Sequence, residues 1–218
     1  MALFGRLTWR GRATIVALAL VCVALYWSIP RNADLRSFDP AKMAALETAM
    51  WRDYYDKRYL NLFFNLYLSS RGEFGFSPLD SMKIALASAN AARTFQPTRS
   101  REEANAALPS LVSYYDLLAR AAPAPFHAEQ AARLELDWWQ ARREDVPPEI
   151  YGKTIAATSA MLYAKTDELM LQAGIERAQA MAFRDQHRND MTDADWSEIE
   201  LRLFKAYSKL QRSVKPPS

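Results

Sequence analysis

Residues 39–70, DPAKMAALETAMWRDYYDKRYLNLFFNLYLSS, carry the clearest signature of the fold. Asp39 is a favoured residue at a helix N-cap, and Pro40 then occupies the first helical position, where its missing N–H is not needed. No glycine follows until Gly72. The stretch therefore predicts one long helix that begins at Pro40 and ends near residue 70.

The remainder of the chain has the same helical character. It contains six glycines in 218 residues, is rich in alanine and leucine, and has few β-branched runs. Capping residues or prolines mark further helix starts at Ser77, Ser100, Pro148 and Thr192. We therefore predict an all-α fold, with about six or seven helices forming one compact domain over residues 39–212 and a short tail at 213–218.

Two stretches of this domain allow alternatives. The helix that begins at Ser100 contains Pro109, whose ring displaces a carbonyl, so we expect a kink or a split there. Residues 148–187 form either one continuous helix that tolerates Gly174, or two helices with a new start at Thr166-Asp167-Glu168, where acidic residues complement the helix dipole.

An uncharged apolar run precedes the domain. Residues 13–29 hold 17 residues without a charge, between a basic tail at 1–12 and a linker at 30–38. As a helix the run spans roughly 25 Å, at the short end of what a bilayer core requires. We predict an uncleaved signal-anchor helix. The alternative is a cleaved secretory signal, but the best cleavage site, with Cys22 and Ala24, would cut inside the run.

The charge distribution bears on location and partners. Three arginines in residues 1–12 disfavour translocation of that tail, so we expect a single-pass protein of the inner (cytoplasmic) membrane with a periplasmic or otherwise extracytoplasmic C-terminal domain. The same arginines account for the net charge of +3, because the rest of the chain has 25 basic and 25 acidic residues. This balance does not favour a nucleic-acid partner.

Aromatic doublets recur at Tyr54-Tyr55, Tyr114-Tyr115 and Trp138-Trp139, each with an arginine a few residues later. Adjacent helical residues point about 100° apart, so each doublet widens the aromatic face of its helix. The doublets are interpreted either as core residues or as a protein-binding surface. In the second interpretation, the candidate partner-binding residues are Tyr55, Tyr115, Trp138 and Trp139.

Charged residues share helix faces with these aromatics. We predict a polar network that contains Glu47, Arg58, Glu135 and Arg142, fully hydrogen-bonded because an unpaired buried charge is costly. The alternative is that Glu47, Glu135 and Glu176 converge as acid–base or metal-binding carboxylates.

Motifs for specific chemistry do not occur. The sequence has no Glu-x-x-His pair, no Gly-x-Ser-x-Gly elbow and no phosphate-binding loop, and its one cysteine, Cys22, lies in the apolar run. We therefore expect no metal and no cofactor. The preferred hypothesis is a membrane-anchored accessory or scaffold protein that binds a partner protein at the membrane surface. The alternatives are a membrane-anchored enzyme that uses the three glutamates, and a helical-repeat adaptor.

Overall fold

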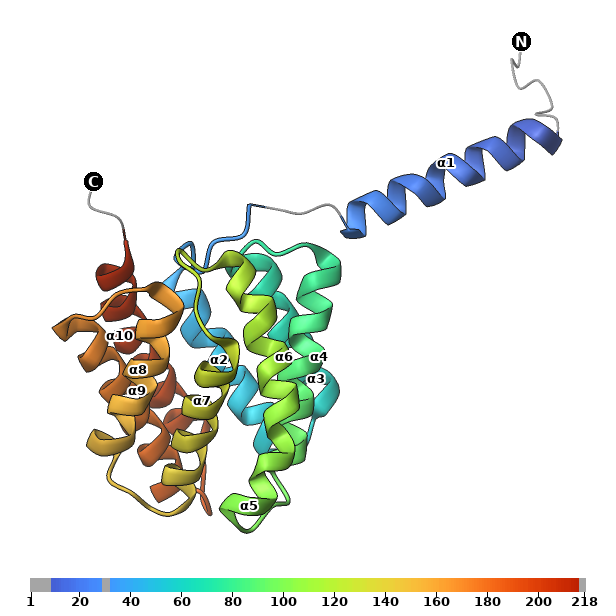
Figure 1. Cartoon of the computed structure of the whole chain (residues 1–218). Helices are drawn as coiled ribbons and strands as arrows, with labels where there is room; N and C mark the ends of the chain where they lie inside the picture. Colours follow the sequence, from blue (N-terminus) through green and yellow to red (C-terminus); the bar gives the residue numbers. More distant parts are fainter. Residues whose placement is uncertain (1–8, 29–31, 216–218) are drawn as a thin grey trace.

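The computed structural model describes residues 9–28 and 32–215, and within these ranges it contains helices and no strands. The all-α prediction is confirmed (Figure 1). The α-helices are α1 (Trp9–Ser28), α2 (Pro40–Tyr55), α3 (Tyr59–Leu68), α4 (Pro78–Phe95), α5 (Arg101–Ala104), α6 (Leu108–Leu118), α7 (Ala128–Arg143), α8 (Pro148–Tyr163), α9 (Glu168–Gln186) and α10 (Asp193–Val214). A π-helical turn, η1 (Ser69–Glu73), follows α3, and two 3₁₀ turns, η2 (Asn105–Ala107) and η3 (Ala119–Ala121), flank α6.

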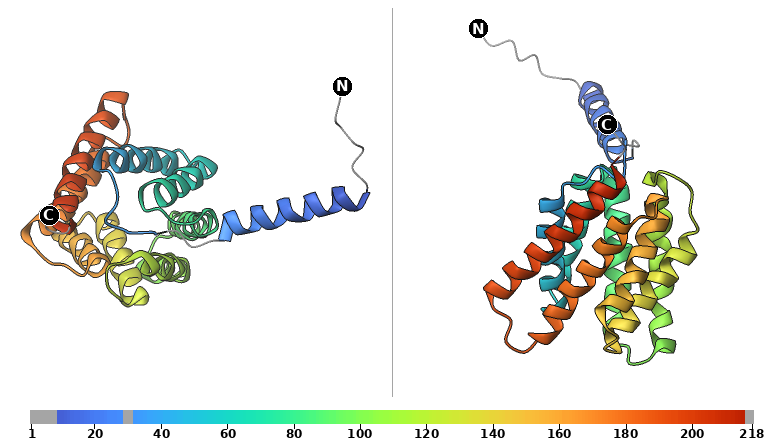
Figure 2. Two further views of the ribbon diagram at one scale, coloured as in Figure 1. Left: turned by 90° about the horizontal axis from the view of Figure 1, so that it is seen from above. Right: turned by 90° about the vertical axis from the view of Figure 1, so that its left-hand side faces the viewer.

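The domain helices are arranged in a closed ring. Each of α2, α3, α4, α6, α7, α8, α9 and α10 packs against the next, and α10 packs against α2 to close the circle. The left view of Figure 2 shows this arrangement from above. Figure 1 shows the short α5 at the lower end of the ring. The closed ring differs from the open array of hairpins that a helical-repeat adaptor would have.

The predicted helix starts have the expected caps. The side chain of Asp39 accepts a hydrogen bond of 2.9 Å from the backbone N–H of Lys42, and Ser77 and Ser100 cap α4 and α5 in the same way. Thr192 and Asp195 form a complete capping box at α10. These caps satisfy backbone donors that the first turn of a helix leaves free.

The prediction of one helix over residues 40–70 is wrong. Helix α2 ends at Tyr55, Lys57 adopts a left-handed conformation with φ +57°, and α3 starts at Tyr59. The buried carboxylate of Asp53 stabilises the break, since it accepts hydrogen bonds of 2.8 Å from both Arg58 and Asn65 on the far side of it. The ring requires this turn, because α2 and α3 are neighbours within it.

The domain has more helices than predicted. Between residues 32 and 215 the described chain forms nine α-helices, α2–α10, rather than six or seven. Besides the break after α2, the helix that begins at Ser100 splits into α5, η2 and α6 just before Pro109. Residues 148–187 form two helices, because Ala164 leaves α8 in a left-handed conformation with φ 50°.

Helices α8 and α9 pack closely because glycines face each other. A Cβ atom on Gly174 would lie 2.5 Å from the carbonyl oxygen of Gly152, and one on Gly152 would lie 2.7 Å from the Cα atom of Ile175. Neither position has room for a side chain. Gly174 is thus a packing requirement of the ring.

Residues 32–39, here called the strap, cross one end of the ring (Figure 2). The backbone N–H of Leu35 donates to the carbonyl of Ala121, and that of Asp34 to the carbonyl of Phe74, both at 3.1 Å. Leu35 and Phe38 are each 1% exposed. Residues 32–38 of the predicted linker are therefore part of the domain and cover this end of the ring, while residues 30 and 31 lie outside the described ranges.

The predicted transmembrane segment at residues 13–29 lies mostly in α1 and partly, at residue 29, outside the described residues. In the ranges that the structure describes, no helix meets the combined requirements of length and apolarity for crossing a membrane. The prediction therefore has no support from the structure. Most of the basic tail, residues 1–8, also lies outside the described ranges.

Candidate functional site

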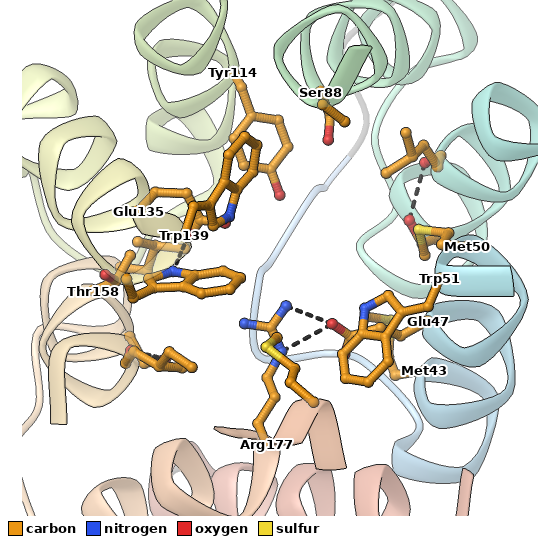
Figure 3. Close-up of a pocket in the computed structure, with 18 of the residues that line it drawn as sticks. Met43, Glu47, Met50, Trp51, Ser88, Tyr114, Glu135, Trp139, Thr158 and Arg177 are labelled. Carbon is orange, nitrogen blue, oxygen red and sulfur yellow. Dashed lines mark hydrogen bonds and ion pairs between the residues drawn. The ribbon is translucent and has the colours of Figure 1, made fainter. Parts of the chain in front are cut away.

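The ring encloses a cavity of about 320 Å³ (Figure 3). Its walls come from all eight ring helices, and Leu35 of the strap contributes at one end. Most of the lining is apolar or aromatic. The charged residues among the described lining are Glu47, Glu135, Arg142 and Arg177.

Helical spacing explains how these side chains come to face inward. On α2 the lining residues Met43, Glu47, Met50 and Tyr54 follow each other at intervals of three or four, as do Glu135, Trp138 and Arg142 on α7. Each ring helix thus presents one face to the cavity, and the aromatic doublets widen that face.

Glu47 forms a buried ion pair with Arg177. Glu47 is 5% exposed, and its Oε1 accepts hydrogen bonds from Nε of Arg177 at 2.9 Å and from Nη2 of the same guanidinium. The hydroxyl of Tyr207 donates to the other oxygen. Burial lowers the pKa of Arg177, but the attraction of Glu47 and their hydrogen bonds outweigh it, and the pKa lies above its usual value. The guanidinium of Arg177 therefore stays protonated.

Glu135 has a different environment. Its Oε2 accepts hydrogen bonds of 2.9 Å from the hydroxyl of Tyr115 and from the indole N–H of Trp138, and its Oε1 accepts one of 3.0 Å from Trp139. All three donors are neutral. Among the described residues, no cationic group lies within ion-pair distance of this carboxylate; the guanidinium of Arg177 lies 5.3 Å from the centre of the Trp138 ring.

At one end of the cavity, an ion pair with Asp185 balances the charge of Arg142. Its Nε and Nη2 donate to the two carboxylate oxygens of Asp185 at 2.7 Å, and Nη2 also donates to the hydroxyl of Tyr55. The guanidinium of Arg184 stacks 3.2 Å above the centre of the Tyr55 ring. With Glu47 paired to Arg177 and Arg142 paired to Asp185, Glu135 is the charged residue of the described lining that forms no ion pair, although the charge of Arg177 acts on it at longer range.

Several donors that line the cavity make no hydrogen bond to the described part of the chain. They include the hydroxyl groups of Tyr114 and Ser88, which point into the cavity in Figure 3, and Nη1 of Arg177. Burial, and then the negative charge of Glu135, raise the pKa of Tyr114 well above its usual value, so its phenol stays protonated. These groups are available to bind an acceptor inside the cavity.

The candidate partner-binding residues all lie inside the ring. Tyr115 and Trp138 are buried, Tyr55 and Trp139 are half-buried, and all four line the cavity. They lie on the inner faces of the ring helices, and their role in binding a partner protein stays a prediction. The physical reason for their inward placement is that aromatic doublets here supply wide inner faces to a ring, in which each helix contacts two neighbours and the cavity.

The predicted polar network and carboxylate cluster form only in part. Glu47, Glu135 and Arg142 line the same cavity, whereas Arg58 lies outside it and pairs with Asp53 and Asp56. Glu176 is also absent from the lining and forms an ion pair with Lys209. The three glutamates therefore do not converge, and among the described residues no group of three histidine, cysteine, aspartate or glutamate side chains is placed to hold a metal ion.

Sequence reasoning missed Arg177, which is the partner of Glu47. A signal for it exists on α9, where Met170, Gly174, Arg177 and Met181 recur at intervals of three or four. All but Met170 line the cavity. The neighbouring residue, Glu176, was predicted to be a site carboxylate, but it lies on another face of α9.

Comparisons with known proteins identify no relative: no protein-family pattern, no curated protein and no solved structure matches the chain significantly. The class of protein is therefore defined by its architecture, a closed α-helical ring around a cavity that contains a carboxylate, Glu135, without an ion-pair partner among the described residues.

Proposed function

We propose that this protein binds a small molecule in the central cavity of its helical domain. The observation that carries the proposal is the charged interior of the cavity. Placing the buried Glu47 and the half-buried Arg177 and Glu135 inside the ring costs stability that an apolar interior would not require. Groups with a shifted pKa, such as Tyr114 and Arg177 here, cluster at functional sites. The volume also falls at the lower end of the range for small-molecule pockets, about 300 to 1,000 Å³.

Acid–base catalysis has less support than binding. Glu47 is occupied by Arg177 and Tyr207, and both oxygens of Glu135 accept hydrogen bonds. A general base needs a carboxylate within reach of a substrate proton. The arrangement favours recognition of a bound molecule over proton transfer.

Native mass spectrometry of the full-length protein in mild detergent tests the proposal. We expect wild-type protein to carry a bound small molecule and the variant Ser88→Met to lose it, because the larger side chain extends into the cavity. Ser113→Met, on the exposed face of α6, is the matched control. A wild-type protein that carries no bound mass, and that gains no thermal stability from a small-molecule extract of its cells, contradicts the proposal.

We also propose that residues 13–29 hold the domain at the inner (cytoplasmic) membrane, with the domain periplasmic or extracytoplasmic. This proposal is supported by the uncharged run and by the arginines that precede it. Membrane fractions washed with alkaline carbonate should retain the full-length protein and lose a protein without residues 1–30. Protease added outside spheroplasts should degrade the domain. Release of the full-length protein by carbonate contradicts the anchor, and protection from protease contradicts the orientation.

A second candidate function is that of an accessory protein for a membrane-protein partner. An apolar stripe on the outer face of α3, at Leu60, Phe64 and Leu68, continues on α4 at Met82 and Leu86, and α1 contacts α4. Leu60 is 76% exposed and Phe64 58%. A helix of a partner anchored in the same membrane fits a stripe of this kind. A photo-crosslinking amino acid at position 64 should capture such a partner only when residues 1–30 are present; capture by an equivalent label at position 113 would show that the contact is not specific.

A further inference from the structure

The unpaired charge of Glu135 determines which kind of ligand the cavity accepts. An anion that entered would meet two carboxylates, Glu47 and Glu135, whereas both cations of the described lining, Arg142 and Arg177, already form ion pairs. A cation would instead meet a carboxylate whose present donors are all neutral. Electrostatic interactions are stronger in an enclosed site than in water, so this difference in charge is decisive.

The aromatic walls favour the same kind of ligand. Trp51 lies on α2, across the cavity from Trp139 on α7, and Tyr114 lies beside Trp139 (Figure 3). The faces of such rings are negative and attract cations, most strongly in sites without bulk water. The protein itself uses this interaction in the cavity, where the guanidinium of Arg177 lies over the ring of Trp138.

The apolar character of the cavity narrows the choice of cation. A metal ion or a primary ammonium ion would need many oxygen ligands to replace its hydration shell, and the lining offers few free acceptors. An alkylated ammonium ion is weakly hydrated and binds through ring faces. The free hydroxyl of Tyr114 and Nη1 of Arg177 would then donate hydrogen bonds to an oxygen on the same molecule.

From these observations we propose that the cavity binds an organic ammonium ion, with its charge between the carboxylate of Glu135 and the surrounding tryptophan rings. The inference rests on the proposed function, because it names the chemical class of the ligand that the cavity holds. It assigns Glu135 to ligand binding, and it assigns the Glu47–Arg177 pair to the architecture of the site.

Three probes of one shape and different charge test this inference. They are choline, the neutral alcohol in which a tert-butyl group replaces the trimethylammonium group, and the tert-butylacetate anion. Binding to the full-length protein in detergent is measured by calorimetry and by quenching of tryptophan fluorescence. We expect choline to bind roughly tenfold or more tightly than the neutral alcohol, and the anion to bind most weakly.

Two variants test whether the carboxylate of Glu135 causes the preference for choline. Glu135→Gln should reduce the preference for choline over the alcohol to the part that the ring faces alone provide, because it removes the charge and keeps the size of the side chain. Glu198→Gln, which removes an exposed carboxylate paired with Arg202 on α10, should leave the preference unchanged. If Glu135→Gln does not fold, the comparison of the three probes on wild-type protein still tests whether the cavity prefers a cation.

Equal binding of choline and the neutral alcohol to wild-type protein overturns the inference, as does an unchanged preference in Glu135→Gln. Failure of all three probes, while native mass spectrometry finds a different bound molecule without a cationic group, overturns the inference and leaves the proposed function standing. Failure of all three probes, together with no bound mass and no gain of thermal stability from the small-molecule extract, overturns both.

Discussion

Arg177→Met tests whether the buried ion pair stabilises the ring. The substitution removes both hydrogen bonds from the guanidinium to Oε1 of Glu47, while Tyr207 remains as a donor to Oε2. Because Glu47 is 5% exposed, bulk water has little access to the carboxylate that is left without its partner. Removing one member of a buried pair costs about 3 to 5 kcal/mol. For a domain of this size the melting temperature should fall by roughly 6 to 20 °C.

Urea unfolding followed by circular dichroism measures this free energy. The control is Arg52→Met, because the pair of Arg52 with Asp193 is exposed and should contribute about 0.5 kcal/mol or less. The double variant Glu47→Leu with Arg177→Met should recover most of the stability, since it buries neither charge. Two results would refute the reasoning: a loss below about 1 kcal/mol in Arg177→Met, or a double variant as unstable as the single one.

Other predictions concern packing, the strap and pH. Gly174→Ala should destabilise the domain strongly, whereas Gly72→Ala, where a Cβ meets nothing within 4 Å, should not; equal melting temperatures would contradict the close packing of α8 and α9. Leu35→Ala should cost about 2 to 5 kcal/mol in urea unfolding, and a loss near zero would show that the strap does not cover the cavity. The hydrogen bond from Arg36 lowers the pKa of Asp34, so the stabilisation is present above the unfolded pKa of about 4 and is lost as pH falls through the lower folded value. Asp34→Asn should weaken this acid-side loss in a melting-temperature profile, and an unchanged profile would exclude the pair as its source.

The sequence predicted the features that depend on local chemistry. Asp39 and Thr192 cap helices because their side chains reach backbone donors three residues away, and this requires no knowledge of the fold. The inner faces of α2 and α7 could also be predicted from the sequence, since Glu47 and Glu135 recur with aromatic residues at helical spacing.

Features that depend on distant contacts were not predictable. The turn after Tyr55 contains neither glycine nor proline, and it is held by Asp53, whose partner Asn65 lies in the next helix. The partner of Glu47 is separated from it by 130 residues. Helical periodicity shows which residues share a face, but the neighbour that a face meets is set by the closure of the ring.

The ring closes where its first and last helices meet, and the polar contacts of Glu47 lie at that junction. Glu47 belongs to α2, Tyr207 to α10 and Arg177 to α9, so one carboxylate links the first helix of the ring to its last two. The strap adds a second link, because the side chain of Gln211 on α10 donates to the backbone of Phe38 just before α2. A buried pair contributes little net stability compared with apolar packing, but its strict partner requirement disfavours other pairings of the same helices. Glu135 has no such role at the junction, since its donors come from α6 and α7, which are consecutive in the ring. Ring closure therefore accounts for the buried charge of Glu47 but not for the half-buried Glu135, whose position agrees with the ammonium ligand that we propose.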